Sequence, residues 1–247
     1  MAVRAVQSGE RRGGLRQRYR LAAPVARTEL QELVRSTGRP VGNDSQFDLL
    51  RAYGTKDAFV HYAGDLALLN SKAVSIVGTR DVSEEGARRA SRLARELAAA
   101  GIVVVSGLAK GVDTAALTSA ITSGGRTVAV IGTPLQKAYP IENADLQAEI
   151  AEQHLLISPF AEGEAVFRGN FPKRNRVMAL LSDATVIVEA SDTSGTLHQA
   201  AECIQRGRWL FILKSVVEDP RINWPQRFLK EERTIVLTKT DDILSRI

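Results

Sequence analysis

Four short segments combine glycine with hydroxyl or basic side chains, and each follows a run of β-branched residues. They are Gly78-Thr79-Arg80, Ser106-Gly107 with Lys110-Gly111, Gly132-Thr133, and Ser191 with Ser194-Gly195-Thr196. Glycine lets backbone N–H groups approach an oxyanion, hydroxyl groups donate hydrogen bonds to it, and Arg80 can add a two-pronged charged contact. Tight turns also need glycine, so one such loop is weak evidence, but four together favour a phosphate-binding site.

The segment Phe171-Pro172-Lys173-Arg174-Asn175-Arg176 carries three cations, an amide and an aromatic ring. Basic groups that hold a phosphate backbone, next to a ring that stacks on bases, are typical of single-stranded nucleic-acid binding. The segment is expected at the start of a helix running from Asn175 to Leu181. The alternative is an ordinary helix start with Phe171 packed in the core. The candidate contacts in this segment are Phe171, Lys173, Arg174, Asn175 and Arg176.

Several kinds of chemistry are disfavoured by the motifs. The sequence has no G-x-x-x-x-G-K-[ST] loop and no G-x-G-x-x-G after the first expected strand, which argues against ordinary ATPases and dinucleotide oxidoreductases. Asp192, Ser194 and His198 could form a hydrolytic triad on spacing alone, but triad partners are normally distant in sequence. The three histidines and Cys203 lack metal-ligand spacing. We therefore expect no catalytic residues, no metal and no cofactor.

Short apolar runs alternate with helical segments from Ala73 onward. The runs are Ala73–Val77, Ile102–Val105, Thr127–Ile131, His154–Ile157, Thr185–Val188 and Trp209–Leu213. Runs that are apolar on both faces are typical of buried parallel strands, and strands separated by helices imply right-handed crossovers. The clearest helix is Glu84–Ala100, with Ser83 as its cap and Gly101 at its end. We predict an α/β fold: a Rossmann-like, doubly wound, mainly parallel sheet.

These patterns divide the chain into three parts. Residues 1–25 are expected to be a basic disordered tail, residues 26–66 a short helical N-terminal segment, and residues 67–247 the Rossmann-like domain. Within the middle part, helices are expected at Glu29–Ser36 and Gln46–Tyr53.

The net charge of +5 belongs entirely to the first 20 residues, which hold six arginines and one glutamate. Nucleic-acid binding must therefore be argued from local residues, and the tail is either a phosphate-holding arm or a solvated end. No apolar run approaches the roughly 20 residues of a membrane span, and no secretory start is present, so we expect a cytoplasmic protein without membrane contact.

From about Phe59 to Gly207, the sequence resembles the DprA/Smf family of bacterial DNA-processing proteins. The matching segments, in order, are Gly64-Asp65, Ile76–Arg80, Ser106–Ala109 with Gly111–Asp113, Gly124-Gly125, Thr127–Gly132, Tyr139-Pro140 with Asn143, Phe171–Arg176, Val188–Ala190 and Ser194–Thr196. The resemblance implies an extended Rossmann fold that binds single-stranded DNA in a basic pocket, forms a homodimer and hands DNA to RecA, without catalysis.

Two other functions stay open. The fold also resembles LOG-type nucleoside-monophosphate phosphoribohydrolases, whose phosphate loop is followed by a glutamate that takes part in cleavage. Here Gln199 stands at that position, with Glu202 one turn further along, and glutamine cannot act as a general acid or base near neutral pH. The third possibility is a non-catalytic sensor that binds a free nucleotide in the same loops.

Overall fold

The computed structural model describes residues 19–40 and 58–247. The elements of the first half are β1 (Ala26–Glu29), α1 (Leu30–Ser36), β2 (Phe59–Gly64), η3 (Leu66–Asn70), β3 (Ala73–Val77), α2 (Glu84–Ala99), β4 (Val103–Ser106), α3 (Val112–Thr122) and β5 (Thr127–Val130). The second half contains η4 (Ile141–Asn143), α4 (Ala144–Gln153), β6 (Leu155–Ser158), α5 (Asn170–Leu181), β7 (Ala184–Ile187), α6 (Thr196–Gln205), β8 (Trp209–Leu213), α7 (Lys214–Val217), α8 (Pro225–Phe228), β9 (Thr234–Leu237) and α9 (Asp241–Leu244).

The strands of the described ranges form one sheet in the order β1-β2-β6-β5-β4-β3-β7-β8-β9. All neighbouring strands from β6 to β9 are parallel, whereas β2 joins β6, and β1 joins β2, in antiparallel orientation. The chain builds one half of the sheet outward from β3 through β4 and β5 to β6, then continues on the other side of β3 with β7. The strand order therefore reverses between β3 and β7, which is where open α/β sheets bind ligands.

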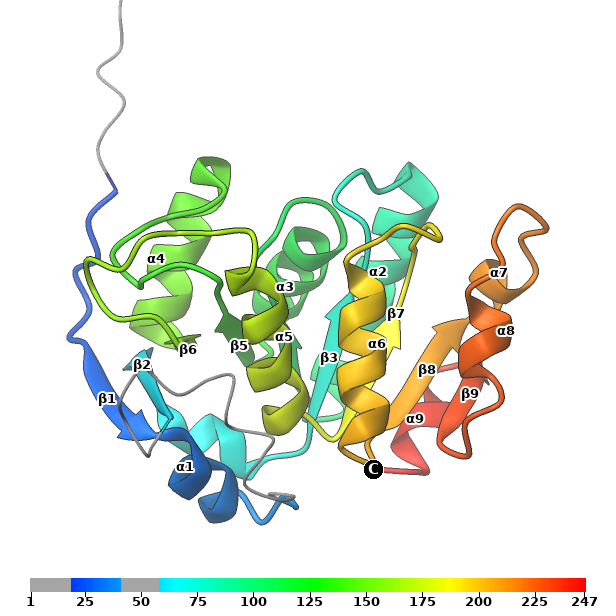
Figure 1. The fold of residues 1–247 in the computed structure, drawn as a ribbon, viewed down its shortest axis with the longest axis horizontal. Coiled ribbons are helices and arrows are strands. Elements are labelled where there is room, and N and C mark those ends of the chain that lie inside the picture. Colours follow the sequence, from blue (N-terminus) through cyan, green and yellow to red (C-terminus); the bar gives the residue numbers. More distant parts are fainter. Residues whose placement is uncertain (1–18, 41–57) are drawn as a thin grey trace, which may run out of the picture.

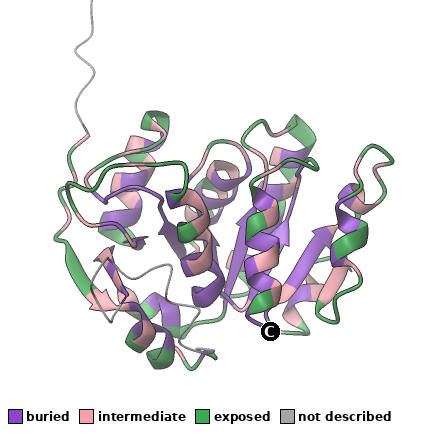
Figure 2. Cartoon of the chain, in the orientation of Figure 1, coloured by how far each residue is buried: buried purple, intermediate pink, exposed green. Residues whose placement is uncertain are grey.

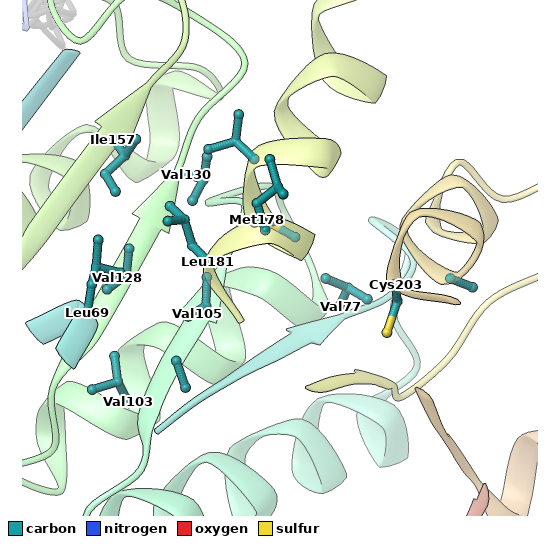
Figure 3. Packing of buried hydrophobic residues seen from close by; sticks show 14 of the residues in the cluster. Leu69, Val77, Val103, Val105, Val128, Val130, Ile157, Met178, Leu181 and Cys203 are labelled. Atoms are coloured by element: carbon teal, nitrogen blue, oxygen red, sulfur yellow. The ribbon is translucent and has the colours of Figure 1, made fainter. Parts of the chain in front are cut away.

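Helices cover both faces of this sheet, with α5 and α6 in front and α2 and α3 behind in Figure 1. Successive side chains of a strand point to opposite faces, so Val103 and Val105 of β4 pack with the α5 layer while Val104 packs with the α2 layer. Figure 3 shows Met178 and Leu181 of α5 above Val105 and its neighbours. The central strands β3 to β7 are buried between two helix layers whose outer sides are exposed (Figure 2).

The predicted α/β fold is confirmed, and each of the six predicted strands lies within one residue of an observed strand at both ends. The helix α2 begins at Glu84 as predicted, because the Ser83 side chain accepts a hydrogen bond from the Gly86 N–H. The prediction for α5 was wrong at its start, which lies at Asn170 rather than Asn175. Pro172 sits in the first turn, where a helix needs no N–H donor, so it does not delay the helix.

The segment 26–66 is not only helical. The predicted helix after Glu29 is confirmed as α1, but β1 and β2 flank it in the chain and extend the sheet. Strands of four and six residues give little periodic signal, and the pairing of β2 with β6 is a long-range contact that the local sequence does not reveal. The helix predicted at Gln46–Tyr53 falls outside the described residues.

The first described residues lie against the domain. Tyr19 Oη accepts a hydrogen bond from Gln147 Nε2 at 3.0 Å, and Leu21 and Ala23 pack against the buried cluster that contains Leu135 and Ile150. Residues 19–25 therefore differ from the solvated tail that we expected, because their apolar side chains cover part of the core. Residues 1–18 lie outside the described part. Within that part, no helix has the length and hydrophobicity that crossing a bilayer requires.

Candidate nucleic-acid interface

Two adjoining cavities open at the carboxyl ends of the parallel strands. The larger, of about 460 Å³, lies where the strand order reverses, between the loop after β3, the loop that leads into α6, and α5. The smaller, of about 320 Å³, lies beside the loops that follow β4 and β5. Arg80, Ala109, Phe171 and Arg174 line both cavities. The loops that the sequence predicted to bind phosphate therefore meet at one place.

The start of α6 forms one wall of the larger cavity, together with Gly78 and Thr79 on the opposite loop. Ser194 Oγ accepts a hydrogen bond from the Thr196 N–H at 3.2 Å and donates one to Thr196 Oγ1 at 2.9 Å. A Cβ on Gly195 would meet no atom within 4 Å, so the backbone is open there. A helix of ten residues directs its positive end at this wall, which favours an anion.

Arg80 and the Phe171 ring lie between the larger cavity and the smaller, and the Tyr139 ring packs beside Phe171 in the smaller one. The exposed Arg80 places its guanidinium carbon 5.3 Å from the centre of the Phe171 ring. That ring lies 5.7 Å from the Tyr139 ring at 43°, and a Cβ on Gly132 would overlap it. Phe171 is only partly buried and lies outside the hydrophobic core clusters, so its ring is available to a ligand from both cavities.

Arg174 differs from Arg80 because it is buried, with 7% of its surface exposed. Its Nη1 donates to the Val130 carbonyl at 2.9 Å, and a Cβ on Gly107 would overlap its guanidinium. The buried Asp113 accepts hydrogen bonds from the N–H groups of Gly107 (3.1 Å) and Ala109 (3.3 Å). Burial raises the pKa of Asp113 and lowers that of Arg174, while the opposite charge of the other residue counteracts each shift. Arg174 thus supports the loop after β4 from beneath the cavities.

Gly111 brings the loops after β3 and β4 together. Its φ is +80°, in the left-handed region that favours glycine, and a Cβ there would overlap the carbonyl groups of Thr79 and Arg80. The next residue, Val112, donates its N–H to the Thr79 carbonyl at 3.3 Å. Gly111 therefore shapes the site without lining either cavity, whereas Lys110 lines the smaller one.

Three other predicted contacts also lie outside both cavities. The fully buried Ser106 donates its hydroxyl to the Ile76 carbonyl at 2.7 Å, so it joins two strands. Lys173 is exposed on α5, and Arg176 binds Glu202 at 2.7 Å. Asn175, in contrast, lines the larger cavity as predicted. The cations of the Phe171–Arg176 segment point in different directions because successive helical residues are rotated by about 100°.

Several residues that line the cavities were not predicted from the sequence. Arg168 and His198 line the larger one, and Tyr139, Ile141 and Glu142 line the smaller one. Tyr139 and Ile141 are 46% and 49% exposed, which is unusual for large apolar side chains in one short segment. Exposure is not visible in a sequence, and only the folded sheet brings this loop beside Phe171.

Three carboxylates near the larger cavity have structural partners. Glu189 accepts hydrogen bonds from the Ser83 N–H (3.0 Å) and hydroxyl (2.6 Å), Glu202 binds Arg176 and Arg206, and Asp192 accepts the N–H groups of the Asn223-Trp224 segment. Gln199 donates to Thr185 Oγ1 at 3.2 Å. Asp192 is therefore not paired with His198. Within the described ranges, no group of three or more His, Cys, Asp or Glu residues could hold a metal ion.

Two relatives resemble the chain along most of its length. A DNA processing protein DprA of Streptococcus pneumoniae is 35% identical over 199 residues, which are 81% of this chain and 70% of the relative. A DprA protein of Bacillus subtilis is 31% identical over 179 residues, covering 72% of this chain and 60% of the relative. The chain thus spans only part of the length of these relatives.

Solved structures agree with this relationship. DprA from S. pneumoniae superposes with a TM-score of 0.72 at 30% identity, covering 93% of this chain and 76% of the other. A DprA structure from Helicobacter pylori, described for its single-stranded DNA binding mode, gives a TM-score of 0.72 at 25% identity, covering 92% and 96%. The profile of the DNA recombination-mediator protein A family matches residues 43–247. This chain belongs to that family, whose members are also named DprA or Smf.

Proposed function

We propose that the chain binds single-stranded DNA at the two adjoining cavities. The observation that supports the proposal is the position of Arg80 and Phe171 between the two cavities. The larger cavity on one side is suited to an anion, and the smaller cavity on the other side is lined by aromatic rings. A nucleotide has the same two parts, a charged phosphate and a flat base. Basic groups beside exposed rings are the usual means of holding a single strand. Membership of the DprA family supports the same function.

The larger cavity is proposed to hold the phosphate. It combines the start of α6 with Thr79, the exposed cations Arg80 and Arg168, and His198. The smaller cavity is proposed to hold an unstacked base against Phe171 and Tyr139. Because the cavities adjoin, one nucleotide can occupy both. The neighbouring nucleotides of the strand then lie along the outer edge of the two cavities.

The chain is proposed to act by binding rather than by catalysis. Proton transfer needs a free acid or base within hydrogen-bond reach of the substrate, and the nearby carboxylates named above are engaged in capping and ion pairs. Incubation with AMP should therefore release no free adenine, as judged by chromatography. Turnover that disappears in Glu189→Gln or Glu202→Gln would establish an enzyme instead.

A free-nucleotide sensor is the second candidate. A cavity of about 460 Å³ beside a helix N-terminus is large enough for a mononucleotide. Labelled oligo-dT of increasing length and AMP distinguish the two functions when each is titrated separately. The DNA function predicts affinity that rises with oligonucleotide length and weak binding of AMP. Saturable AMP binding with no binding of oligo-dT would favour the sensor.

Family membership also supports two proposals about assembly: that the chain forms a homodimer, and that it passes single-stranded DNA to RecA. Light scattering of the purified chain tests the first, and a strand-exchange assay with RecA tests the second. A monomeric mass at all concentrations, or unchanged RecA activity, would contradict the respective proposal.

A further inference from the structure

An ion pair stands at the rim of the smaller cavity. Lys110, on the loop after β4, and Glu142, in η4, lie 2.8 Å apart between Nζ and Oε1. Their side chains are 54% and 59% exposed, so both can exchange this contact for one with a ligand. Both line the same cavity as Tyr139 and Phe171. The cavity therefore offers a base two aromatic rings, one acceptor group and one donor group.

The segments that carry the pair are held together by buried groups. Asn143, next to Glu142, donates Nδ2 hydrogen bonds of 2.9 Å to the Leu108 carbonyl and to Thr114 Oγ1. Leu108 is fully buried with a φ of +57°, a left-handed conformation that leucine rarely adopts. Such strain persists only where the surroundings impose it, and it is common at ligand sites. Lys110 and Glu142 thus emerge from loops whose spacing is fixed before a ligand binds.

We propose that Lys110 and Glu142 give the base site a preference for guanine. The proposal rests on the proposed DNA binding. An unpaired base exposes its Watson–Crick edge, and that of guanine has two neighbouring donors, N1–H and N2–H, beside the O6 acceptor. The two oxygens of Glu142 accept both donors, and the Lys110 ammonium group donates to O6.

The other bases match this pair less completely. Thymine has one N–H donor between two acceptors, while adenine and cytosine have one amino group next to an acceptor nitrogen. One carboxylate oxygen would then face an acceptor or remain without a partner, which is unfavourable. Because the pair is more than half exposed, water relieves part of this cost. The preference is about fivefold, at the low end for a two-point base contact, and is confined to one nucleotide.

The test compares oligo-dT with the same oligonucleotide carrying one central dG, dA or dC, by fluorescence anisotropy with the full chain. The expected result is that one dG raises affinity over oligo-dT by up to about fivefold, the gain for the register that puts dG in the base site, while dA and dC do not. If oligo-dT binds but dG gives no gain, or another base is preferred, the inference is wrong and the proposed DNA binding stands. If no oligonucleotide binds, both fail.

Variants assign the preference to Glu142. Glu142→Gln places an amide donor opposite a guanine donor, so the advantage of the dG oligonucleotide over oligo-dT should vanish in this variant. Glu232→Gln is the matched control, since Glu232 is exposed and lies outside the smaller cavity. A dG advantage that survives in Glu142→Gln would overturn the assignment. The comparison of bases in the unmodified chain tests the preference even if that variant is unstable.

Discussion

Arg80 and Arg174 carry the same charge on one rim of the sheet, but their surroundings give them different roles. Arg80 is exposed and stacks on Phe171, so its remaining donors are open to a phosphate. Arg174 is buried and donates to the Val130 carbonyl, near Asp113. The sequence predicted both as phosphate contacts; Arg174 lines both cavities, but its burial is not visible from residue type and spacing.

Replacing Arg80 tests its proposed contact with DNA. Arg80→Ala should weaken oligo-dT binding by roughly 1–3 kcal/mol, because a charged hydrogen bond is lost. The thermal stability of this variant should equal that of the parent chain to within a few degrees, since the Arg80 side chain is exposed. Arg95→Ala is the control, because Arg95 is exposed on α2 and lines neither cavity at the sheet edge. Binding by Arg80→Ala that equals that of the parent chain would show that Arg80 does not hold the strand.

Replacing Arg174 should affect the fold first. Arg174→Ala leaves the Val130 carbonyl without its donor and Asp113 without a nearby positive charge, which should lower the free energy of unfolding by about 3 kcal/mol. Urea denaturation measures this, and the exposed Lys173→Ala on the same helix should change stability by less than about 0.5 kcal/mol. Unchanged stability with lost DNA binding would instead support the direct contact predicted from the sequence.

The helices and strands show how far sequence patterns reach. The central strands could be predicted because parallel strands buried on both faces are continuous apolar runs. The edge strand β1 and its neighbour β2 could not, since they are short and partly exposed, and β2 depends on pairing with the distant β6. Similarly, the glycine loops indicated both cavities, but Tyr139, which lines the smaller one, lies in a loop that only the folded sheet brings beside Phe171.

The packing of α6 on the sheet predicts an inert thiol. Cys203 is fully buried, and burial raises the pKa of its thiol to about 12. Thiolate is the reactive form, so the native protein should not react with a disulfide reagent from pH 7 to 9, whereas the urea-unfolded chain should react stoichiometrically. Rapid labelling of the native protein would mean that α6 separates readily from β8 and exposes Cys203.

At the scale of the whole molecule, attraction for DNA must be local. The first 20 residues hold the entire net charge of +5, so the rest of the chain is neutral overall. A neutral domain binds a polyanion only if its cations are gathered at one place, and Arg80, Arg168 and Lys110 line the two adjoining cavities. The fold creates this local charge by bringing three separate loops to one edge of the sheet.

The dependence of oligo-dT affinity on salt tests this claim most directly. Each phosphate held by a cation contributes about −0.7 to the slope of log affinity against log salt for a single strand. With the two exposed cations Arg80 and Arg168 at the larger cavity, the cavity should contribute about −1.4 to the slope, and Arg80→Ala should reduce the magnitude of the slope by about 0.7. A flat salt dependence, or an unchanged slope in Arg80→Ala, would contradict a phosphate site at the carboxyl ends of the strands.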